Sequence, residues 1–276
     1  MRRTSAIILF GVFAGIVAGA QSPATGAHAP VRVILVGDST VAPHNGWGPG
    51  FCAIASAEVT CLNLGKNGRS SGSYRAEGSW DAVIKELRSP QGFHATYVLI
   101  QFGHNDQPGK PGRSTDLATE FPVNMRRYVQ EGKAAGGNPI LITPLTRRSF
   151  TAGKLKNDLV PWGDATRKIG QEENIPVLEL NAESSSAVQR MGGAEANTLA
   201  MAPPPPEFAA SAAAGDSLPA PKPQPQPTNA RAATPVPVFD YTHLGPKGSD
   251  FFGRMVAQEL LSALPGLHAY FKDAPQ

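Results

Sequence analysis

The alternation of apolar runs along the 276-residue chain restricts its fold more than any other feature. Short runs rich in β-branched residues recur at 31–36, 59–64, 96–102, 139–143 and 176–180. Between them, apolar residues have helical spacing over 47–58, 79–87, 117–135 and 162–173. Strands that alternate with helices at such intervals form right-handed βαβ units around a mostly parallel sheet. The sequence therefore predicts an α/β fold, arranged as a three-layer sandwich and closed by a final helix near 251–261.

The first twenty residues have the pattern of a secretory signal. Arg2 and Arg3 precede an apolar run at 6–17, and three small residues follow it. The run is too short for a good membrane span. We expect cleavage after Ala20 and an exported protein, secreted or periplasmic, with a linker at 21–30 and a single domain at 31–276. The alternative is an uncleaved membrane anchor.

Charge gives little reason to expect a polyanionic partner. The formal net charge of +3 includes Arg2 and Arg3, so removal of these two cations leaves +1. This is too balanced for an electrostatic footprint on nucleic acid or on an anionic membrane. On this measure, neutral substrates fit better.

The two cysteines, Cys52 and Cys61, are nine positions apart. A disulfide between them fits an exported chain in an oxidising compartment. Two buried thiols fit equally well, because spacing alone does not show whether the Cβ atoms face each other. The sequence leaves both possibilities open.

The segment 203–237 interrupts the α/β pattern. Eleven of its thirty-five residues are Pro and nine are Ala, with almost no large apolar side chains. Such a composition predicts an extended, largely disordered insertion with polyproline character inside the domain. The alternative is a docking site for a proline-binding partner.

A serine stands at the end of the first predicted strand, where the run 31–36 stops at Gly37, Asp38, Ser39 and Thr40. A buried strand that ends in a tight turn presents a side chain at the carboxyl edge of the sheet, where open α/β sheets bind ligands. Alone, the pattern also fits a plain turn before a helix cap. Its meaning depends on partners elsewhere in the chain.

Three other polar blocks should meet Ser39 at this edge. Gly68 and Asn105 follow the second and third predicted strands, and Asp240 and His243 precede the final helix. A serine becomes a nucleophile when a His takes its proton, and an Asp holds the imidazole tautomer and stabilises its cation. The spacing of three lets Asp240 reach Nδ1 of His243 while Nε2 faces Ser39.

Attack on an ester carbonyl creates an oxyanion that needs hydrogen-bond donors. We predict the backbone N–H groups of Ser39 and Gly68 and the side-chain amide of Asn105, each worth a few kcal/mol when preorganised. Gly68 suits this role because a residue without Cβ lets the substrate approach its N–H closely.

These blocks resemble the SGNH or GDSL hydrolase superfamily in type, order and location. They are Gly37-Asp38-Ser39-Thr40, Asn67-Gly68-Arg69-Ser70, Gly103-His104-Asn105-Asp106 and Asp240-Tyr241-Thr242-His243. With Asn45-Gly46-Trp47-Gly48, Ser73-Tyr74 and Glu77-Gly78 added, the chain is similar to the rhamnogalacturonan acetylesterase family over 31–261, apart from the proline-rich segment. Thr40, where the wider superfamily has Leu, is typical of that branch.

The resemblance implies a flavodoxin-like α/β/α sandwich with a mostly parallel five-stranded sheet, and no metal or other cofactor. It implies Ser39 as nucleophile, Gly68 and Asn105 as oxyanion donors, and Asp240 and His243 as the other triad members. The expected substrate is an acetylated plant cell-wall polysaccharide such as pectin. The insertion directly before Asp240 departs from the family pattern and leaves the shape of the substrate groove open.

Four further residues are expected to contact substrate or support the site: Asp38, Trp47, Arg69 and His104. Asp38 has a structural role beside Ser39 on this interpretation. His104 either lines the site or supports it from behind, and Trp47 either stacks on a sugar or supports the catalytic loop. The remaining aromatic candidates for sugar stacking are Tyr74, Trp80 and Trp162, of which the two tryptophans fit core packing better.

Other functional classes lack their motifs. No group of His, Cys, Asp or Glu has convincing metal-ligand spacing, and no Walker loop is present. The glycines at 65, 68 and 72 have the wrong spacing for dinucleotide binding. The leading hypothesis is an exported serine carbohydrate esterase. The alternatives are an esterase or lysophospholipase of the same superfamily acting on lipid or aryl esters, and a catalytically silent carbohydrate-binding scaffold.

Overall fold

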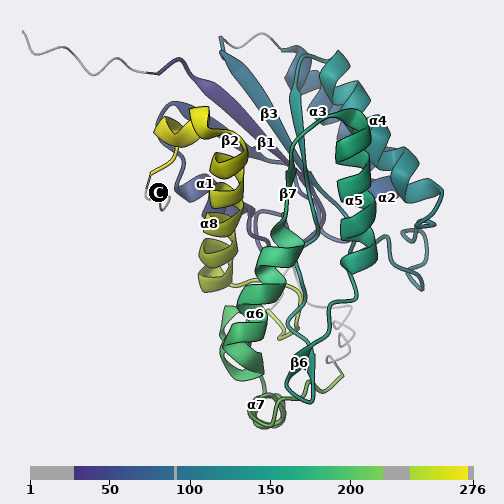
Figure 1. The fold of residues 1–276 in the computed structure, drawn as a ribbon, viewed down its shortest axis with the longest axis vertical. Helices are drawn as coiled ribbons and strands as arrows, with labels where there is room; N and C mark the ends of the chain where they lie inside the picture. Colours follow the sequence, from purple (N-terminus) through teal and green to yellow (C-terminus); the bar gives the residue numbers. More distant parts are fainter. Residues whose placement is uncertain (1–27, 90–91, 220–236, 273–276) are drawn as a thin grey trace, which may run out of the picture.

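A parallel five-stranded sheet forms the centre of the computed structural model, which describes residues 28–89, 92–219 and 237–272 (Figure 1). The strand order is β2-β1-β3-β4-β7, and each neighbouring pair is parallel. The α/β class and the parallel sheet predicted from the sequence are confirmed. The strands are β1 (Val31–Gly37), β2 (Val59–Asn63), β3 (Ala95–Gln101), β4 (Asn138–Ile142) and β7 (Val177–Leu178).

Both faces of the sheet are buried, which explains why its strands read as continuous apolar runs. All seven residues of β1 are buried. Val33 and Leu35 belong to the core on one face, whereas Ile34 and Val36 belong to the core on the other. Because side chains alternate along a strand, one apolar run serves both cores.

Helices cover the two faces and complete the three layers (Figure 1). On one face, Phe51 and Phe252 bring α1 and α8 into the core. On the other, Trp80, Tyr128 and Ile169 do the same for α3, α4 and α5. These helices are α1 (Gly48–Ala53), α3 (Ser79–Arg88), α4 (Glu120–Ala134), α5 (Val160–Glu173) and α8 (Pro246–Ala263).

Several elements, among them the long helix α6 (Leu180–Ala196), have no counterpart in the sequence prediction. The predicted strand 176–180 is reduced to two residues because α6 begins where it was expected to end. Gly192, with φ 70° and ψ 170°, interrupts α6, which is rich in small residues and lacks a clear apolar stripe. The other unpredicted elements are α2 (Ser71–Ala76), β5 (Phe150–Thr151), β6 (Lys154–Leu155), η1 (Asn197–Leu199) and η2 (Pro265–Tyr270).

The first part of the proline-rich segment is folded, contrary to the expectation of an extended chain. Pro206–Ala213 form helix α7, with Pro at the helix start and alanines along it. Phe208 is buried against Phe239 and Tyr241, with ring centroids 5.6 and 6.4 Å apart. One large apolar side chain thus anchors a stretch that composition alone marks as a linker. Residues 220–236 lie outside the described residues, as do the predicted signal at 1–20 and most of the predicted linker.

Cys52 and Cys61 form a disulfide, with their Cα atoms 5.6 Å apart. Of the two arrangements that the sequence left open, the structure has the bonded one. The bridge joins the end of α1 to β2, beside the first crossover of the sheet.

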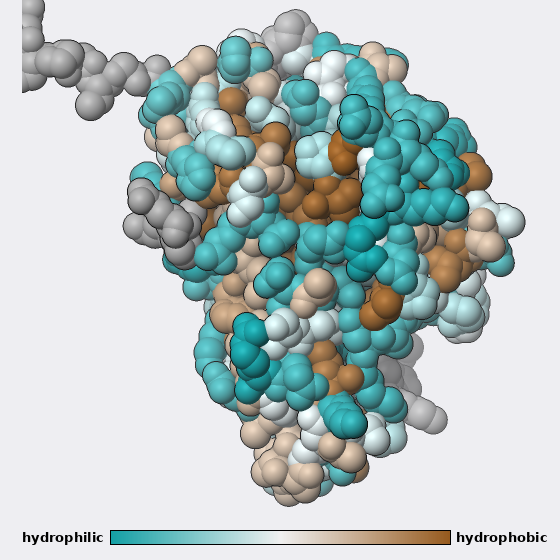
Figure 2. All heavy atoms as spheres, in the orientation of Figure 1, coloured by the Kyte–Doolittle hydropathy of each residue, from teal (hydrophilic) through white to brown (hydrophobic). Residues whose placement is uncertain are grey.

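Hydrophilic residues cover most of the face shown in Figure 2, with apolar residues visible between α8 and α5. Among the helices of the described residues, none has the length and apolar character needed to cross a membrane.

Candidate active site

The candidate site lies where β1, β2 and β3 end. The turn after β1 carries Ser39, and the loops after β2 and β3 carry Gly68 and Asn105. The loop before α8 is tied to the first of these turns, because Leu244 N–H donates to the Asn45 carbonyl at 2.9 Å. Segments about 200 positions apart in sequence therefore meet at one edge of the sheet.

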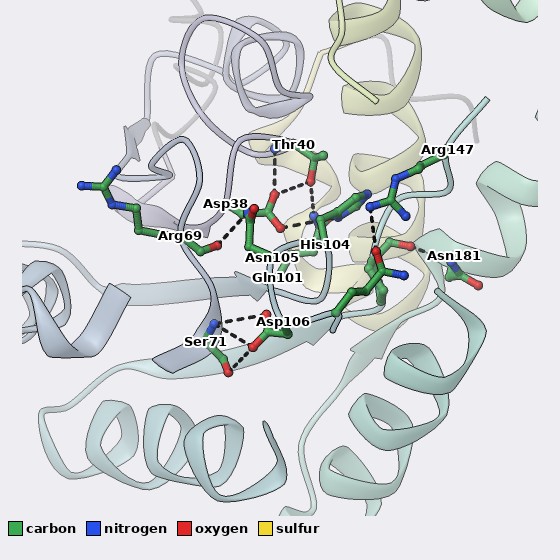
Figure 3. A network of polar contacts seen from close by, with 12 residues as sticks. Asp38, Thr40, Arg69, Ser71, Gln101, His104, Asn105, Asp106, Arg147 and Asn181 are labelled. Atoms are coloured by element: carbon green, nitrogen blue, oxygen red, sulfur yellow. Dashed lines mark hydrogen bonds and ion pairs between the residues drawn. The ribbon is translucent and has the colours of Figure 1, made fainter. Parts of the chain in front are cut away.

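A network of hydrogen bonds fixes the turn that carries Ser39 (Figure 3). Asp38 Oδ1 accepts from the Thr40 N–H at 2.8 Å and from Thr40 Oγ1 at 2.7 Å. Thr40 Oγ1 also accepts from Gln101 Nε2, whose Oε1 accepts from Trp47 Nε1 at 2.9 Å. The four residues of this network are fully buried: Asp38, Thr40, Gln101 and Trp47. Their hydrogen bonds hold the turn from its buried side, and Ser39 is 6% exposed.

Asp38 and His104 face each other below the site, with 3.4 Å between Oδ2 and Nδ1. Burial alone would raise the pKa of Asp38, but His104 and the donors of Thr40 hold it below its ordinary value. Burial lowers the pKa of His104, against the opposing effect of Asp38. The sequence predicted that His104 either lines the site or supports it. Because His104 is only 2% exposed, it supports the site.

The aromatic residues considered for sugar stacking are buried. Trp47, Tyr74, Trp80 and Trp162 range from 0 to 7% exposed. Trp47 supports the Ser39 turn through Gln101, and Tyr74 donates to the Leu64 carbonyl at 2.8 Å. Core packing, the interpretation that the sequence favoured for Trp80 and Trp162, is confirmed. Trp47 has the supporting role that was one of its two predicted roles, and stacking was wrong for Tyr74.

The loops after β2 and β3 hold the two further predicted oxyanion donors next to each other. Gly68 has φ 75°, a left-handed conformation that favours glycine. Asn105 Nδ2 donates to the carbonyl of Arg69 at 3.0 Å. An amide nitrogen carries two hydrogens, so this bond orients Asn105 while leaving a second donor available.

Asp106 joins these two loops from inside. Its side chain accepts from the Ser71 N–H at 3.1 Å, from Ser71 Oγ at 2.6 Å and from Thr115 Oγ1 at 2.7 Å. Burial raises the pKa of Asp106 to about 6, against the effect of these donors. The carboxylate therefore fixes the start of α2, three residues after Gly68, to the loop that carries Asn105.

Arg69 lies at the rim with its side chain 41% exposed. Its Nη2 is 2.7 Å from Glu77 Oε2. The hydrogen bond from Arg69 is the largest cause of the lowered pKa of Glu77, which is about 2. The side chain of Arg69 is thus already paired, while its carbonyl orients Asn105.

Asp240 and His243 form the pair that the sequence predicted. His243 Nδ1 is 2.6 Å from Asp240 Oδ2, and Oδ1 accepts from the N–H groups of Thr242 and His243 at 2.7 Å each. Burial would raise the pKa of Asp240, but the hydrogen bond and charge of His243 and these N–H donors lower it to about 2. In the described residues, no hydrogen bond joins His243 to Ser39. Catalytic hydrogen bonds are often long without substrate and tighten in the complex.

Arg148 was missed by the sequence analysis, although it anchors the Asp240–His243 loop. Its guanidinium is fully buried and donates to the carbonyls of Asp240 at 3.0 Å, Thr242 at 3.3 Å and His243 at 2.9 Å. Burial lowers its pKa to about 10, against the effect of Asp240. The only signal in the sequence is an arginine pair shortly after the fourth strand run.

Within the parts of the chain that the structure describes, no cluster of three or more His, Cys, Asp or Glu side chains could hold a metal ion. The arrangement instead offers a serine on a fixed turn, an Asp–His pair and three N–H donors. These groups are suited to acyl transfer.

Comparison with known proteins places this arrangement in a family. The chain is 33% identical over 178 residues to the rhamnogalacturonan acetylesterase RhgT of Bacillus subtilis, covering 62% of this chain and 73% of RhgT. The chain belongs to the rhamnogalacturonan acetylesterase family. A second relative, named probable rhamnogalacturonan acetylesterase YesY of the same species, is 27% identical over 177 residues, 62% of this chain and 79% of YesY. Members of this family are carboxylic ester hydrolases, and so is this protein. A search with family models finds no match.

Solved structures confirm the SGNH fold of this rhamnogalacturonan acetylesterase family member. The protein YxiM of Bacillus subtilis has a TM-score of 0.63 at 21% identity, covering 88% of this chain and 59% of YxiM. A protein of Parabacteroides merdae described as a GDSL-like lipase has a TM-score of 0.54 at 14% identity, covering 84% of this chain and 95% of that one. At these identities the likeness concerns the fold alone.

Proposed function

We propose that this carbohydrate acetylesterase removes acetyl groups from a pectic polysaccharide of the rhamnogalacturonan type through a covalent acyl-enzyme on Ser39. The observation that carries the proposal is the 2.6 Å contact between Asp240 and His243 on a loop that is hydrogen-bonded to the turn region of Ser39. Gly68 and Asn105 at the same edge supply the donors that an acyl transfer needs. The names of the two relatives point to the substrate.

In the first half-reaction, His243 Nε2 takes the proton of Ser39 Oγ as this oxygen attacks the acetyl carbonyl carbon. The carbonyl oxygen becomes an oxyanion that accepts from the N–H groups of Ser39 and Gly68 and from Asn105 Nδ2. When the tetrahedral intermediate collapses, the bond to the sugar oxygen breaks and the imidazolium returns its proton to that oxygen. Acetyl-Ser39 and a free sugar hydroxyl result.

In the second half-reaction, His243 takes a proton from water, which attacks the acetyl-serine carbonyl. Collapse of the second intermediate releases acetic acid and returns the proton to Ser39 Oγ. Asp240 Oδ2 accepts from Nδ1–H throughout, so that Nε2 is the nitrogen free to take a proton at the start of each half-reaction. Its lowered pKa keeps this carboxyl ionised over the working range of pH.

Replacement of Ser39 by Ala tests the mechanism. We expect acetate release from acetylated rhamnogalacturonan to fall by a factor of about 10³ or more, because the variant lacks the hydroxyl that attacks the ester. An unchanged melting temperature shows that the variant is folded. Mass spectrometry of the wild type, quenched during turnover, should find the acetyl group on Ser39. Acetate release by the folded variant at the wild-type rate would refute the proposal.

A hollow next to Asp240 is lined by both charged and apolar side chains. It has a volume of about 580 Å³ and borders Asp240, Tyr241 and Thr242. Its charged lining residues are Arg147, Lys156 and Asp158, and its apolar ones include Phe150, Leu218 and Pro219. Because the names of the two relatives point to a pectic substrate, release of acetate from acetylated pectin should exceed cleavage of long-chain esters. The reverse order would favour the lipid esterase.

We further infer that the protein is exported. The support is the Cys52–Cys61 disulfide, since such bonds persist mainly in oxidising compartments. N-terminal sequencing of protein recovered outside the cytoplasm should begin at Gln21. A mature protein that begins at Met1 would favour the uncleaved anchor instead.

A further inference from the structure

Arg113 lies beside two of the oxyanion donors without belonging to the triad. Its Nη1 is 3.4 Å from Asn105 Oδ1. The same nitrogen is 3.4 Å from the position that a Cβ on Gly68 would occupy. The side chain of Arg113 is exposed, so its guanidinium stands at the rim on the side of Gly68 and Asn105.

The loop that carries Arg113 is held by its own hydrogen bonds. The N–H groups of Arg113 and Ser114 donate to the Lys110 carbonyl at 3.0 and 2.9 Å. The Thr115 N–H donates to the Asp106 carbonyl at 3.0 Å, and Thr115 Oγ1 donates to the Asp106 carboxylate. Because Asp106 adjoins Asn105 in the chain, the loop fixes the backbone of Arg113 relative to the site.

Arg113 forms no ion pair with any acid of the described residues, and neither does Lys110. The other rim arginines do: Arg69 pairs with Glu77 and Arg147 with Asp158, each at 2.7 Å. Arg113 and Lys110 therefore place two positive charges without an ion-pair partner, among the described residues, at one edge of the site.

Lys110 is half-buried, and the charged groups that face it are Arg113, Arg147, Asp38 and Asp158. Burial, with the two arginines nearby, lowers its pKa. Arg147 is already paired with Asp158, and Asp38 is buried against Thr40 and His104. The local excess of positive charge contrasts with the nearly balanced charge of the whole chain. A cationic rim that is not neutralised internally favours an anionic ligand.

We propose that Arg113, with Lys110 behind it, binds a carboxylate of a uronic acid at or next to the acetylated sugar. The proposal rests on the proposed function, whose pectic substrate carries carboxylates, and it assigns recognition of a carboxylate to Arg113. A guanidinium carries five N–H donors and matches the two oxygens of a carboxylate. Asn105 uses one of them, which leaves a pair of donors for the substrate.

A different role would have the same geometry. Arg113 could act only through Asn105, by holding its amide in place for the oxyanion. That role would change hydrolysis of every acetyl ester equally, whereas carboxylate binding changes only hydrolysis of acidic substrates. The test therefore compares acidic and neutral ligands.

Binding is measured first, because it needs no catalysis. Calorimetry compares an unacetylated galacturonate oligosaccharide with the same oligosaccharide after reduction of its carboxyl groups to alcohols. We expect Arg113→Gln to weaken binding of the acidic oligosaccharide about tenfold, with a smaller loss for Arg113→Lys, and to leave the neutral one unchanged. Arg190→Gln is the matched control, because Arg190 is exposed on α6 and its guanidinium donates to Ser186 Oγ, away from the site.

Kinetics then gives the second comparison. The kcat/KM of Arg113→Gln should fall about tenfold more on acetylated galacturonate oligosaccharides than on acetylated xylo-oligosaccharides. Equal losses on both substrates would show that Arg113 only orients Asn105, and equal wild-type binding of acidic and reduced oligosaccharides would also overturn the proposal. If Ser39→Ala kept full activity, the proposed mechanism would fail, while the binding comparison would still decide the carboxylate site.

Discussion

At the scale of single residues, Asp240 is held by more donors than any other group of the triad loop. It accepts from two backbone N–H groups and faces His243 Nδ1 at 2.6 Å. In Asp240→Asn, the amide oxygen can still accept from the backbone, but the amide nitrogen then faces Nδ1 and favours the tautomer with hydrogen on Nε2. We expect kcat to fall by about 10³ to 10⁴ with a smaller change in KM, measured as acetate release. A decrease of less than tenfold would contradict this role.

The same substitution predicts a pH dependence of stability. The pKa of Asp240 is about 2 in the folded protein, below its ordinary value. The ionised carboxyl therefore stabilises the fold above about pH 4, and this stabilisation is lost as the pH falls from there through about 2. The melting temperature of Asp240→Asn should lie furthest below that of the wild type near pH 7 and converge with it near pH 2. A difference that is the same at both pH values would count against the ionised carboxyl as its source.

Thr40 offers a test of the turn that carries Ser39, the proposed nucleophile. Thr40→Val preserves shape but removes the hydroxyl that bonds both Asp38 and Gln101. We expect the free energy of unfolding to fall by about 1 to 3 kcal/mol, because a buried amide donor loses its acceptor. Chemical denaturation measures this change. Thr60→Val, at an exposed position of β2, is the control and should change stability by less than about 0.5 kcal/mol.

At the scale of elements, the Asp240–His243 loop depends on an arginine from another part of the chain. Arg148 follows β4 and donates to three carbonyls of this loop, while its own N–H donates to the Tyr241 carbonyl at 2.9 Å. Lysine retains the charge but cannot reproduce the planar fork of donors. We expect Arg148→Lys to lower kcat about 10- to 100-fold with little change in KM, because the loop loses its alignment and not its contact with substrate.

The measurement needs a readout that separates alignment from folding. The rate at which a fluorophosphonate labels Ser39 reports on the Ser39–His243 geometry and should fall in parallel with kcat. Circular dichroism at the assay temperature establishes that the variant is folded. A normal labelling rate in Arg148→Lys would show that the Asp240–His243 loop keeps its alignment without the guanidinium of Arg148.

Helix α7 is a second support of this loop. Phe208 is buried against Phe239 and Tyr241, which immediately precede and follow Asp240. Phe208→Ala should destabilise the protein by about 3 kcal/mol and lower activity below the melting temperature. Deletion of 220–236, between the described segments, should leave activity intact. Full activity and stability of Phe208→Ala would show that α7 does not hold the loop.

At the scale of the whole molecule, the central sheet could be predicted from the sequence because its inner strands β1, β3 and β4 are mostly buried and consist largely of apolar residues. The prediction placed β1 to within one residue of its observed bounds. α6 could not be found in the same way, since its small residues form no apolar stripe. Helix α7 was hidden for a related reason, because its tertiary anchor is a single Phe in a stretch dominated by Pro and Ala.

The predicted site residues are those whose chemistry is visible in their type and in their place at the end of a strand. Ser39, Gly68 and Asn105 follow strands, and the spacing of Asp240 and His243 indicates their contact. Their supports were harder to predict. Gln101 is a polar residue inside an apolar strand run, and Arg148 becomes informative only when the fold buries it against distant carbonyls. Contacts between remote segments leave no periodic pattern in the sequence.

The two halves of the site come from opposite ends of the domain. Ser39 follows the first strand, whereas His243 precedes the last long helix. Helices α1 and α8 join these ends, with Gly50 N–H donating to Ser249 Oγ at 3.0 Å and no room for a Cβ on Gly50. During synthesis the proposed nucleophile therefore emerges about 200 residues before His243, the proposed general base. Hydrolytic activity would accordingly require synthesis to proceed beyond His243, and shorter nascent chains would be inert towards esters.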